Sequence, residues 1–519
     1  MSALAKNPEE NSLKAAYWVG DADQRPVALF RIALGAFVLF DLFEFTPNLR
    51  AWFSDEGVFP RASLLANWTR GARLCLFDAF GSPAMVWAYW GLAVVAAAAM
   101  MIGYRTRWAA AATFVLMAGF QERLPPLFDG SDTVLRLMLF WHIFTRSGNV
   151  WSIDALQAQA ARRPLSLLGP ALPVRLLQSQ IGWVYLCSVF FKEQGTFWRN
   201  GTTVHYVMHL TGVFTHRWAA PIGDVRWLVM GATYGTLALE ALFLFLIHAP
   251  VWHRQLKAFA LLAGTALHAG IGFTMAIGHF SYLMPLTYLS MFEPSWTQAV
   301  VDRVSTWLPQ GWAQGWGKVA AALPAGAPRG SVFSVFRPLA TAALALAFLS
   351  VSWYSLPQQA KRFLPIPVSD AVDYASLWSA WDMFAPDPLH TDYQLTATGE
   401  LENGVHVNLF GGPAGSTGEV RGYFFTRWWK YEENVIGGNQ TLPLEWGRYM
   451  CRERNFNLRP GEPRLHTFSL VKEARDIPAI GQPWPEVRRE VIWNHQCYDT
   501  AEKKPDRSGA LIATQLPSH

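Results

Sequence analysis

The chain has 519 residues, of which 51% are hydrophobic and 16% are charged, and its formal net charge is +5. A mean hydropathy of +0.14 is high for a soluble protein. The positive charge is not accompanied by a compact Lys/Arg stripe or a nucleic-acid-binding motif, so we predict no nucleic-acid partner and assign the excess charge to membrane topology.

Residues 1–26 form a polar N-terminal tail that carries no pattern of a cleavable signal peptide. The first apolar block starts near Val27, and no small-residue cleavage site precedes it. We therefore expect this block to be a retained signal anchor.

Apolar residues over 27–356 are gathered in blocks, which is typical of membrane-spanning helices. The blocks predict a mainly α, polytopic transmembrane helix bundle with about nine crossings. Several blocks are shorter than the ~20 residues of a perpendicular crossing, so we expect those to be tilted, broken or packed inside protein. The predicted blocks are 27–46, 83–103, 108–121, 132–146, 174–192, 227–248, 257–275, 278–293 and 336–356.

Lysine and arginine predict the orientation of the bundle. They are about twice as frequent in the segments that face the cytoplasm when the N-terminus lies inside. An odd number of crossings then places the C-terminal region on the extracytoplasmic face. We expect a multi-pass protein surrounded by the lipid bilayer of a plasma membrane.

Residues 357–519 have a different composition and predict a small extramembrane α+β domain. The stretch "YQLTATGELENGVHVNLFGG" alternates between apolar and polar residues, and Asn403-Gly404 within it predicts a two-residue β-hairpin turn. The later stretch "TRWWKYEENVIGG" predicts a helix that ends at its glycine pair.

The four cysteines show no CxxC spacing, so a zinc or redox motif is not predicted. Cys75 and Cys187 lie in or near apolar blocks. Cys451 and Cys497 both lie in the polar C-terminal region and can form a disulfide if that region is extracytoplasmic.

Lys192 stands at the end of the apolar run "IGWVYLCSVFFK", where an ammonium group costs a few kcal/mol at the bilayer centre. One explanation is that the side chain snorkels to the membrane surface. The other is that apolar surroundings disfavour the charged form, so that the neutral amine acts as a base. If Glu193 faces Lys192, the carboxylate stabilises the ammonium and the second explanation weakens.

Other ionisable residues lie inside apolar blocks, where each is either a functional group or half of an ion pair between helices. Arg31 and Asp41 are about 15 Å apart along one predicted helix, so each needs another partner. The remaining residues of this kind are Glu44, Arg136, His142, Glu240, His268 and His279.

His268 and His279 lie in one apolar stretch that also contains Gly270, Gly272 and Gly278. These glycines predict a helix break, and a break at membrane depth requires surrounding protein or a cavity. The stretch therefore predicts a pocket. No spacing such as HExxH supports metal ligation, and we predict no metal site.

Four stretches make the chain resemble the vitamin K-dependent gamma-carboxylases and the bacterial HTTM-domain proteins that share their membrane core. They are "RPVALFRIALGAFVLFDL" with "FSDEGVFPR", "NVWSIDAL" leading to "QIGWVYLCSVFFK", "HAGIGFTMAIGHFSYLM", and "LWSAWDMFAPDP" followed by "RWWKY". Their order and spacing match the family from about Arg25 to Cys451. The resemblance implies a protein of the bacterial inner membrane.

The resemblance implies that Lys192 is the base that deprotonates a reduced vitamin K-type quinone, a hydroquinone or menaquinol. With O2 this chemistry yields a stronger base, which deprotonates an acceptor for capture of CO2. A neutral amine is needed for that step, and apolar surroundings exclude water. The acceptor would be a protein or peptide, and a membrane or periplasmic partner protein is also expected.

By the same resemblance, His268 and Asn149 join Lys192 as candidate catalytic residues. Asn149 stands where the carboxylases carry a histidine before a similar motif, and an amide cannot relay charge as an imidazole does. The candidate quinone-binding residues are Arg31, Arg136, His142, Trp151, Glu240, His279 and Tyr282.

Two further interpretations of the sequence stay open. The chain can be a non-catalytic membrane scaffold or partner subunit that kept the fold. It can also be a transporter of lipids or small molecules, although the internal repeats common among transporters are not visible.

Overall fold

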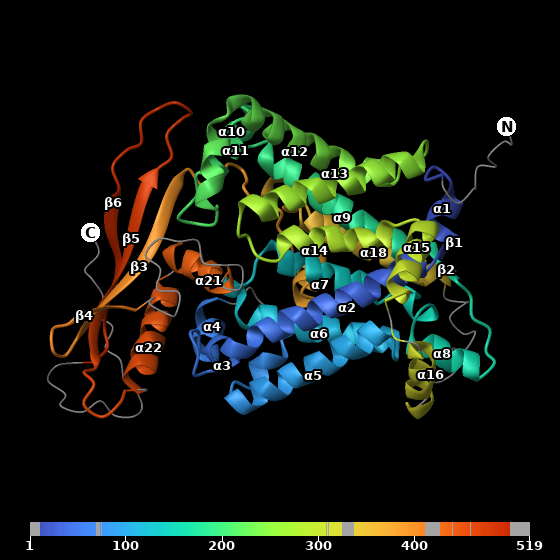
Figure 1. Ribbon diagram of the computed structural model, residues 1–519, viewed down its shortest axis with the longest axis horizontal. Coiled ribbons are helices and arrows are strands. Elements are labelled where there is room, and N and C mark those ends of the chain that lie inside the picture. The colour runs from blue at the N-terminus through green and yellow to red at the C-terminus, as the bar shows by residue number, and fades with distance from the viewer. Residues whose placement is uncertain are drawn as a thin grey trace.

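The computed structural model describes residues 11–68, 73, 75–307, 309, 311–323, 337–409, 426–437, 440–456 and 458–498. Helices form most of this part of the chain, and a four-stranded antiparallel sheet lies near its C-terminal end. The sheet stands beyond one end of a helix bundle, and helix α1, Ala15–Val19, lies at the other end (Figure 1).

Each of the nine predicted apolar blocks corresponds to a helix of the bundle. These helices are α2 Arg25–Phe45, α5 Pro83–Ile102, α6 Thr106–Arg123, α7 Gly130–His142, α9 Ala171–Lys192, α12 Arg226–Ile247, α13 His253–Thr274, α14 Phe280–Thr287 and α18 Arg337–Tyr354. The shorter helices that connect or flank them are α3 Leu49–Phe53, α4 Arg61–Asn67, α8 Ile153–Ala160, α10 Thr196–Arg199, α11 Thr203–Met208, α15 Pro294–Ser305, α16 Trp312–Ala322, α19 Gln358–Lys361 and α20 Ile366–Tyr374.

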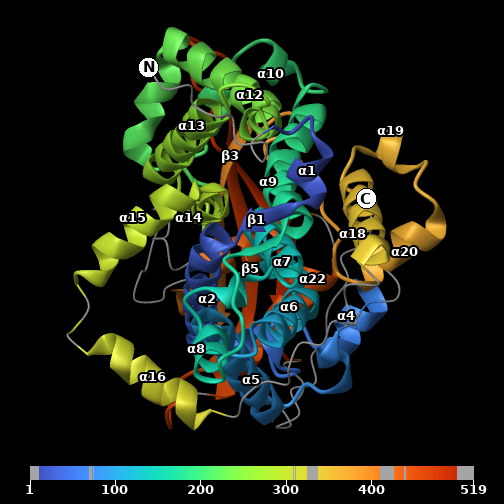
Figure 2. The ribbon, with the colours of Figure 1, turned by 90° about the vertical axis from the view of Figure 1, so that its right-hand side faces the viewer.

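Four helical segments of the described chain are long and apolar enough to cross a membrane. They are Arg25–Phe53, which joins α2 to α3, and the helices α5, α12 and α13. Of the others, α7 has 13 residues and α14 has 8, so neither reaches the length of a crossing. Residues Ser131–Leu139 of α7 are all buried, and α7 lies inside the bundle when it is viewed end-on (Figure 2).

Helices α12 and α13 lie at the outer edge of the bundle (Figure 2). Both present large apolar side chains to the surroundings. On α12, Trp227 is 73% exposed and Phe245 is 61% exposed. On α13, Leu262 is 72% exposed and Phe273 is 70% exposed. A contiguous apolar face of this kind is stable against lipid and unfavourable against water.

The predicted break between His268 and His279 is confirmed. Helix α13 ends at Thr274 and α14 begins at Phe280, with Gly278 at φ +70° in the connection. The neighbouring loop satisfies the freed backbone groups, since Ala276 N donates to Phe214 O at 2.8 Å. This arrangement meets the requirement that irregular backbone at membrane depth be paired within the protein.

The C-terminal sheet has the strand order β4-β3-β5-β6, formed by β3 Thr391–Leu401, β4 His406–Asn408, β5 Leu465–Asp476 and β6 Arg488–Gln496. The predicted hairpin joins β3 to β4, but its loop has three residues, 402–404, rather than two. Leu401 N donates to Val405 O, and Gly404 N donates to Leu401 O, both at 2.9 Å. Gly404 at φ +78° supplies the left-handed residue that such a loop needs.

Two helices lie between the sheet and the bundle (Figure 1). The predicted helix at "TRWWKYEENVI" is α21, Thr426–Ile436, and the second is α22, Thr441–Phe456. Tyr431 of α21 and Trp446 of α22 are buried against each other with ring centroids 6.0 Å apart. These aromatic contacts hold α21 and α22 against each other in the domain that borders one end of the bundle. A minor two-stranded pairing joins β1, Asp21–Asp23, to β2, Leu168–Pro170.

The predicted disulfide is confirmed: Cys451 on α22 is bonded to Cys497, which follows β6. We expect that replacing both residues with alanine lowers the free energy of unfolding by about 2–4 kcal/mol, because the crosslink no longer restricts the unfolded chain. Denaturant unfolding of the purified protein in detergent measures this difference. Cys187→Ala, which removes a buried free thiol, is the control variant and should cost less.

A second prediction concerns the pH dependence of this domain. Burial, together with the charge of Arg448, lowers the pKa of His495 on β6 to about 4. The unfolded chain therefore binds a proton below about pH 6.5 that the folded chain does not bind until about pH 4. Stability should be fully present above pH 6.5 and should fall toward pH 4, by at most about 1.4 kcal/mol per pH unit.

Hydrogen exchange of β5 and β6 peptides in the intact protein, recorded between pH 7 and pH 4.5, follows this loss after correction for the intrinsic exchange rate. A His495→Gln variant should show a flatter profile. An equally steep profile in the variant would assign the pH dependence to other groups.

Candidate active site

A cavity of about 300 Å³ lies between α9, α12 and α13. Most of its wall is apolar, formed by side chains such as Val184, Val207, Ile271 and Phe280. Lys192, Glu240 and His268 also line it, so three of the residues predicted from sequence meet in one place.

Lys192 is the last residue of α9, and Glu240 lies on the facing side of α12. The Lys192 Nζ donates to both carboxylate oxygens of Glu240, at 2.6 and 2.7 Å. The side chains are only 5% and 9% exposed, which excludes snorkelling as the explanation of Lys192. Glu193, the other partner considered from sequence, is exposed at the surface.

Two further interactions hold the lysine head in place. The Nζ lies 4.7 Å from the ring centroid of Trp198 on α10, within the range of a cation–π contact. The C-terminal end of α9 contributes its partial negative charge near the ammonium. A buried charge pair of this kind becomes unstable when one partner is removed, because the other charge is left uncompensated.

His268 belongs to a short hydrogen-bonded chain of three buried rings. The hydroxyl of Tyr185 on α9 is 2.6 Å from His268 Nε2 and 2.5 Å from the hydroxyl of Tyr288. The other ring nitrogen, His268 Nδ1, is buried and has no hydrogen-bond partner among the described residues. A polar atom of a ligand in the cavity would satisfy this nitrogen.

The cavity reaches the molecular surface between α12 and α13. Ala232 of α12 and Ala266 and Gly270 of α13 line the cavity and are exposed on the outside of the bundle. The same two helices carry the apolar outer face described above. The cavity and the apolar outer face therefore share the same two helices.

Four predicted residues lie together near the N-terminal end of α9, away from Lys192. Arg31 donates from Nη1 to Ser147 O at 2.8 Å and from Nη2 to Trp151 O at 2.5 Å. His142 Nε2 pairs with Ser147 Oγ at 3.0 Å. These contacts make Arg31 and His142 supports of the loop that carries Trp151.

Asn149 lies in the same loop, and its Nδ2 donates to Ser166 O at 3.1 Å, just before the strand that leads into α9. Lys192 is at the opposite end of α9, whose 22 residues span about 33 Å. The structure therefore does not bring Asn149 to Lys192, and direct cooperation between the two side chains is excluded in this conformation.

Arg136, another predicted quinone-binding residue, lies outside the cavity wall. It donates to Gln121 Oε1 at 2.7 Å and to Trp378 O at 2.8 Å, and its guanidinium covers the Trp378 ring at 4.4 Å. These contacts join α6 and α7 to the segment that follows the last long helix. Its role here is structural.

His279 and Tyr282 belong to a buried charge cluster. This cluster also contains Asp41, which the sequence left without an identified partner. His279 Nδ1 is 3.3 Å from Asp41 Oδ1, and His279 Nε2 is 2.8 Å from Glu44 Oε2. Arg427 of α21 bonds to Asp41 and, at 3.0 Å, to Asp132 of α7. The ring of Tyr282 packs 5.4 Å from that of His279. The cluster fastens the C-terminal domain to α2 and α7.

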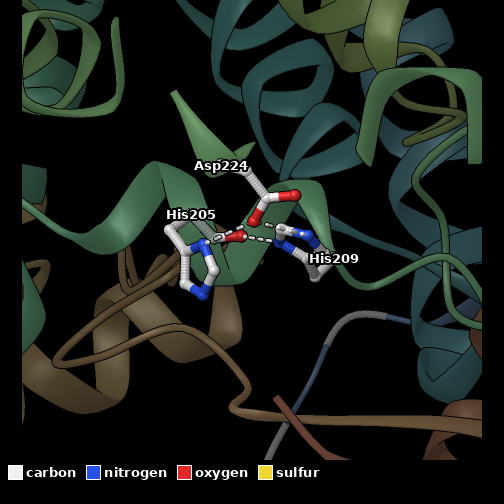
Figure 3. Close-up of side chains that lie close together, drawn as sticks. All are labelled: His205, His209 and Asp224. Atoms are coloured by element: carbon white, nitrogen blue, oxygen red, sulfur yellow. Dashed lines mark hydrogen bonds and ion pairs between the residues drawn. The ribbon is translucent and has the colours of Figure 1, made fainter. Parts of the chain in front are cut away.

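Sequence reasoning missed several residues of interest. Tyr185 gave no signal because an aromatic side chain in an apolar segment is ordinary core. Trp198 lies outside the apolar blocks, in the stretch "EQGTFWRN", where nothing links it to Lys192. His205, His209 and Asp224 form a second polar cluster beside the sheet (Figure 3). The spacing of four residues between the two histidines was the available signal, since it places both on one helical face.

Together these features define a mainly helical protein, with four helices able to cross a membrane and a lysine–glutamate pair in the wall of an apolar cavity. Comparisons with protein-family models, with curated proteins and with solved structures found no match to this chain.

Proposed function

We propose that this protein is an integral membrane enzyme that binds a reduced, vitamin K-type quinone in the Lys192 cavity and uses it in an oxygen-dependent reaction on an acceptor molecule. The observation that carries the proposal is the buried Lys192–Glu240 pair at the wall of an apolar cavity that opens between two outward-facing apolar helices. The family resemblance supplies the reaction class.

The cavity residues fit a lipid-soluble quinol in three respects. A volume of about 300 Å³ is at the lower end of the usual range for small-molecule sites. The apolar wall suits a fused ring system, and the unpartnered His268 Nδ1 suits a ring hydroxyl or carbonyl. Lys192 and His268 would hold the polar ends of the ligand, and it would enter between α12 and α13.

The chain itself can move a proton from a hydroxyl group that reaches Lys192. Glu240 accepts a proton from Lys192 Nζ as Nζ takes one from the hydroxyl, which restores the ammonium beside the new negative charge. Lys192 then acts as a relay and electrostatic partner, and Glu240 is the final proton acceptor. A bound reduced quinone would supply reducing equivalents and, with dioxygen, the strong base that the carboxylation of an acceptor requires.

The proposal includes a location. We propose an odd number of crossings, fewer than the nine predicted from sequence because α7 and α14 are too short to span, with the N-terminus cytoplasmic and the C-terminal domain on the outer face of a bacterial inner membrane. The separation of α1 from the sheet along the bundle and the Cys451–Cys497 bond support this orientation. A protein or peptide acceptor would then meet the cavity from the side of the sheet.

The direct test uses the full-length protein in nanodiscs with vitamin K hydroquinone or menaquinol, oxygen and bicarbonate. Mass spectrometry should detect the quinone epoxide. Folded protein that neither binds the quinols nor forms epoxide would point to a non-catalytic scaffold. Saturable binding without epoxide would favour a carrier of lipids or small molecules.

Blocking the entrance should reduce quinol binding. A Cβ added at Gly270 meets no atom within 4 Å, so Gly270→Phe places a ring at the cavity edge with no clash at its Cβ. We expect at least a tenfold loss of quinol affinity, measured by titration in nanodiscs. Gly231→Phe is the matched control, because this α12 glycine is equally open but is not part of the cavity wall. Equal loss in both variants would argue against entry at Gly270.

A further inference from the structure

A second polar cluster lies beside α11, the helix whose Thr203, Val207 and Met208 line the Lys192 cavity, but its own residues are not part of that cavity wall. His205 belongs to α11, His209 follows this helix by one residue, and Asp224 ends the 3₁₀ helix η6, Arg217–Asp224. Figure 3 shows the three side chains directed toward one another. Asp224 Oδ1 is 3.8 Å from His205 Nδ1 and 3.4 Å from His209 Nε2.

In each imidazole ring, one nitrogen makes a hydrogen bond to a backbone carbonyl, and this bond fixes the orientation of the ring. His209 Nδ1 is 2.8 Å from His205 O, and His205 Nε2 is 2.8 Å from Pro478 O. A carbonyl only accepts, so each of these nitrogens carries the proton. His209 Nε2 then holds a lone pair that faces Asp224, whereas His205 Nδ1 faces both Asp224 Oδ1 and the carbonyl oxygen of Gly223. Histidines that bind metals usually donate their other N–H in this manner.

The oxygen atoms around His205 Nδ1 favour a positive charge at this position. This nitrogen faces two oxygen acceptors, Gly223 O at 2.8 Å and Asp224 Oδ1 at 3.8 Å. A nitrogen lone pair against two such oxygens is repulsive unless a positive centre lies among them. His205 is only 2% exposed, so bulk water does not relieve this repulsion. The positive centre is either a second proton on His205 or a metal ion.

We propose that His205 Nδ1, His209 Nε2 and Asp224 Oδ1 bind a first-row divalent transition metal of the Zn²⁺ type. Bond lengths of about 2.0–2.1 Å in a tetrahedral site place neighbouring ligand atoms about 3.4 Å apart. The 3.4 Å separation of His209 from Asp224 matches this value, and the 3.8 Å separation of His205 from Asp224 needs a small contraction. Two histidines and a carboxylate form a ligand set that suits zinc.

With three side-chain ligands, the fourth coordination position would go to Gly223 O, which is 2.8 Å from His205 Nδ1, or to a water molecule or exogenous ligand once that carbonyl turns away. His209 and Asp224 line a separate cavity of about 530 Å³, which Asp392, Arg475 and Trp484 border from the side of the sheet. The bond from His205 to Pro478, just after β5, links the ligand set to the C-terminal domain. Metal binding would therefore strengthen the contact between that domain and the bundle.

The test is a metal titration of the full-length protein in detergent after treatment with a chelator. We expect one Zn²⁺ per chain by elemental analysis and the visible absorption of four-coordinate Co²⁺ when cobalt is added instead. His209→Gln and Asp224→Asn should each weaken binding by more than the about 10–100-fold that is typical for loss of an outer-shell partner. His216→Gln, a nearby histidine stacked on Trp218, is the control and should leave affinity unchanged.

Two results would overturn the proposal. The first is folded wild-type protein that neither retains Zn²⁺ nor gives the Co²⁺ absorption, which would assign a second proton to His205. The second is binding that His209→Gln and Asp224→Asn leave unaltered. Since wild-type protein alone can give the first result, the test holds even if a variant fails to fold.

Discussion

Replacing Lys192 with methionine is expected to lower quinol turnover by about 10²–10⁴-fold, the usual effect of losing a group that transfers a proton. It should also destabilise the protein by about 3–5 kcal/mol, because Glu240 is left as an unpaired charge in a buried site. Turnover of the quinol to its epoxide and thermal unfolding in detergent measure the two effects separately.

The double variant Lys192→Met/Glu240→Gln separates function from folding. It removes both buried charges, so most of the lost stability should return, whereas turnover should stay as low as in the single variant. Glu193→Gln is the control, since this exposed neighbour does not belong to the pair. Full turnover in the double variant would show that the pair is purely structural and would remove the basis of the proposed function.

The second large effect is expected at Arg427, whose side chain connects α21 to the bundle. Arg427→Met should destabilise the contact by about 3–5 kcal/mol, because Asp41 and Asp132 keep their buried carboxylates without the guanidinium between them. The domain should then loosen from the bundle. Hydrogen exchange by mass spectrometry should show faster exchange in α21, followed by the strands.

The matched control is Lys430→Met on the same helix. Lys430 pairs with Glu433 at 2.7 Å, and both side chains are more than a quarter exposed. An ion pair of this exposure contributes about 0–1 kcal/mol, so the exchange pattern should stay close to that of the wild type. A similar pattern in Arg427→Met would mean that apolar packing alone holds the domain in place.

The positions of the long helices could be predicted from sequence because the apolar blocks carry that signal locally. The break after α13 was also predictable, since Gly278 and its neighbours weaken a helix whatever surrounds it. The hairpin was found, but its loop length was not. A single Asn-Gly pair does not distinguish a two-residue turn from a three-residue loop with glycine in the left-handed position.

The partners of the buried charges could not be predicted. Glu240 is 48 residues from Lys192, and Arg427 is 386 residues from Asp41. Such pairings depend on how helices pack, and a single sequence does not record this. The same limit explains the error at Asn149. The sequence resemblance predicted it as a catalytic residue, but in the fold it lies near the N-terminal end of α9, opposite Lys192.

In the proposed function, the opening of the Lys192 cavity between α12 and α13 means that the concentration of quinol in the lipid, and not in the buffer, sets how much of the protein has quinol bound. A ligand that enters from the lipid is presented at its mole fraction in the bilayer, and its total amount per volume of buffer is irrelevant. Adding empty liposomes at constant total quinol would dilute the ligand in two dimensions and slow the reaction. An ionic inhibitor confined to the aqueous phase would have no such dependence, so surface dilution would reveal from which phase the cavity is filled.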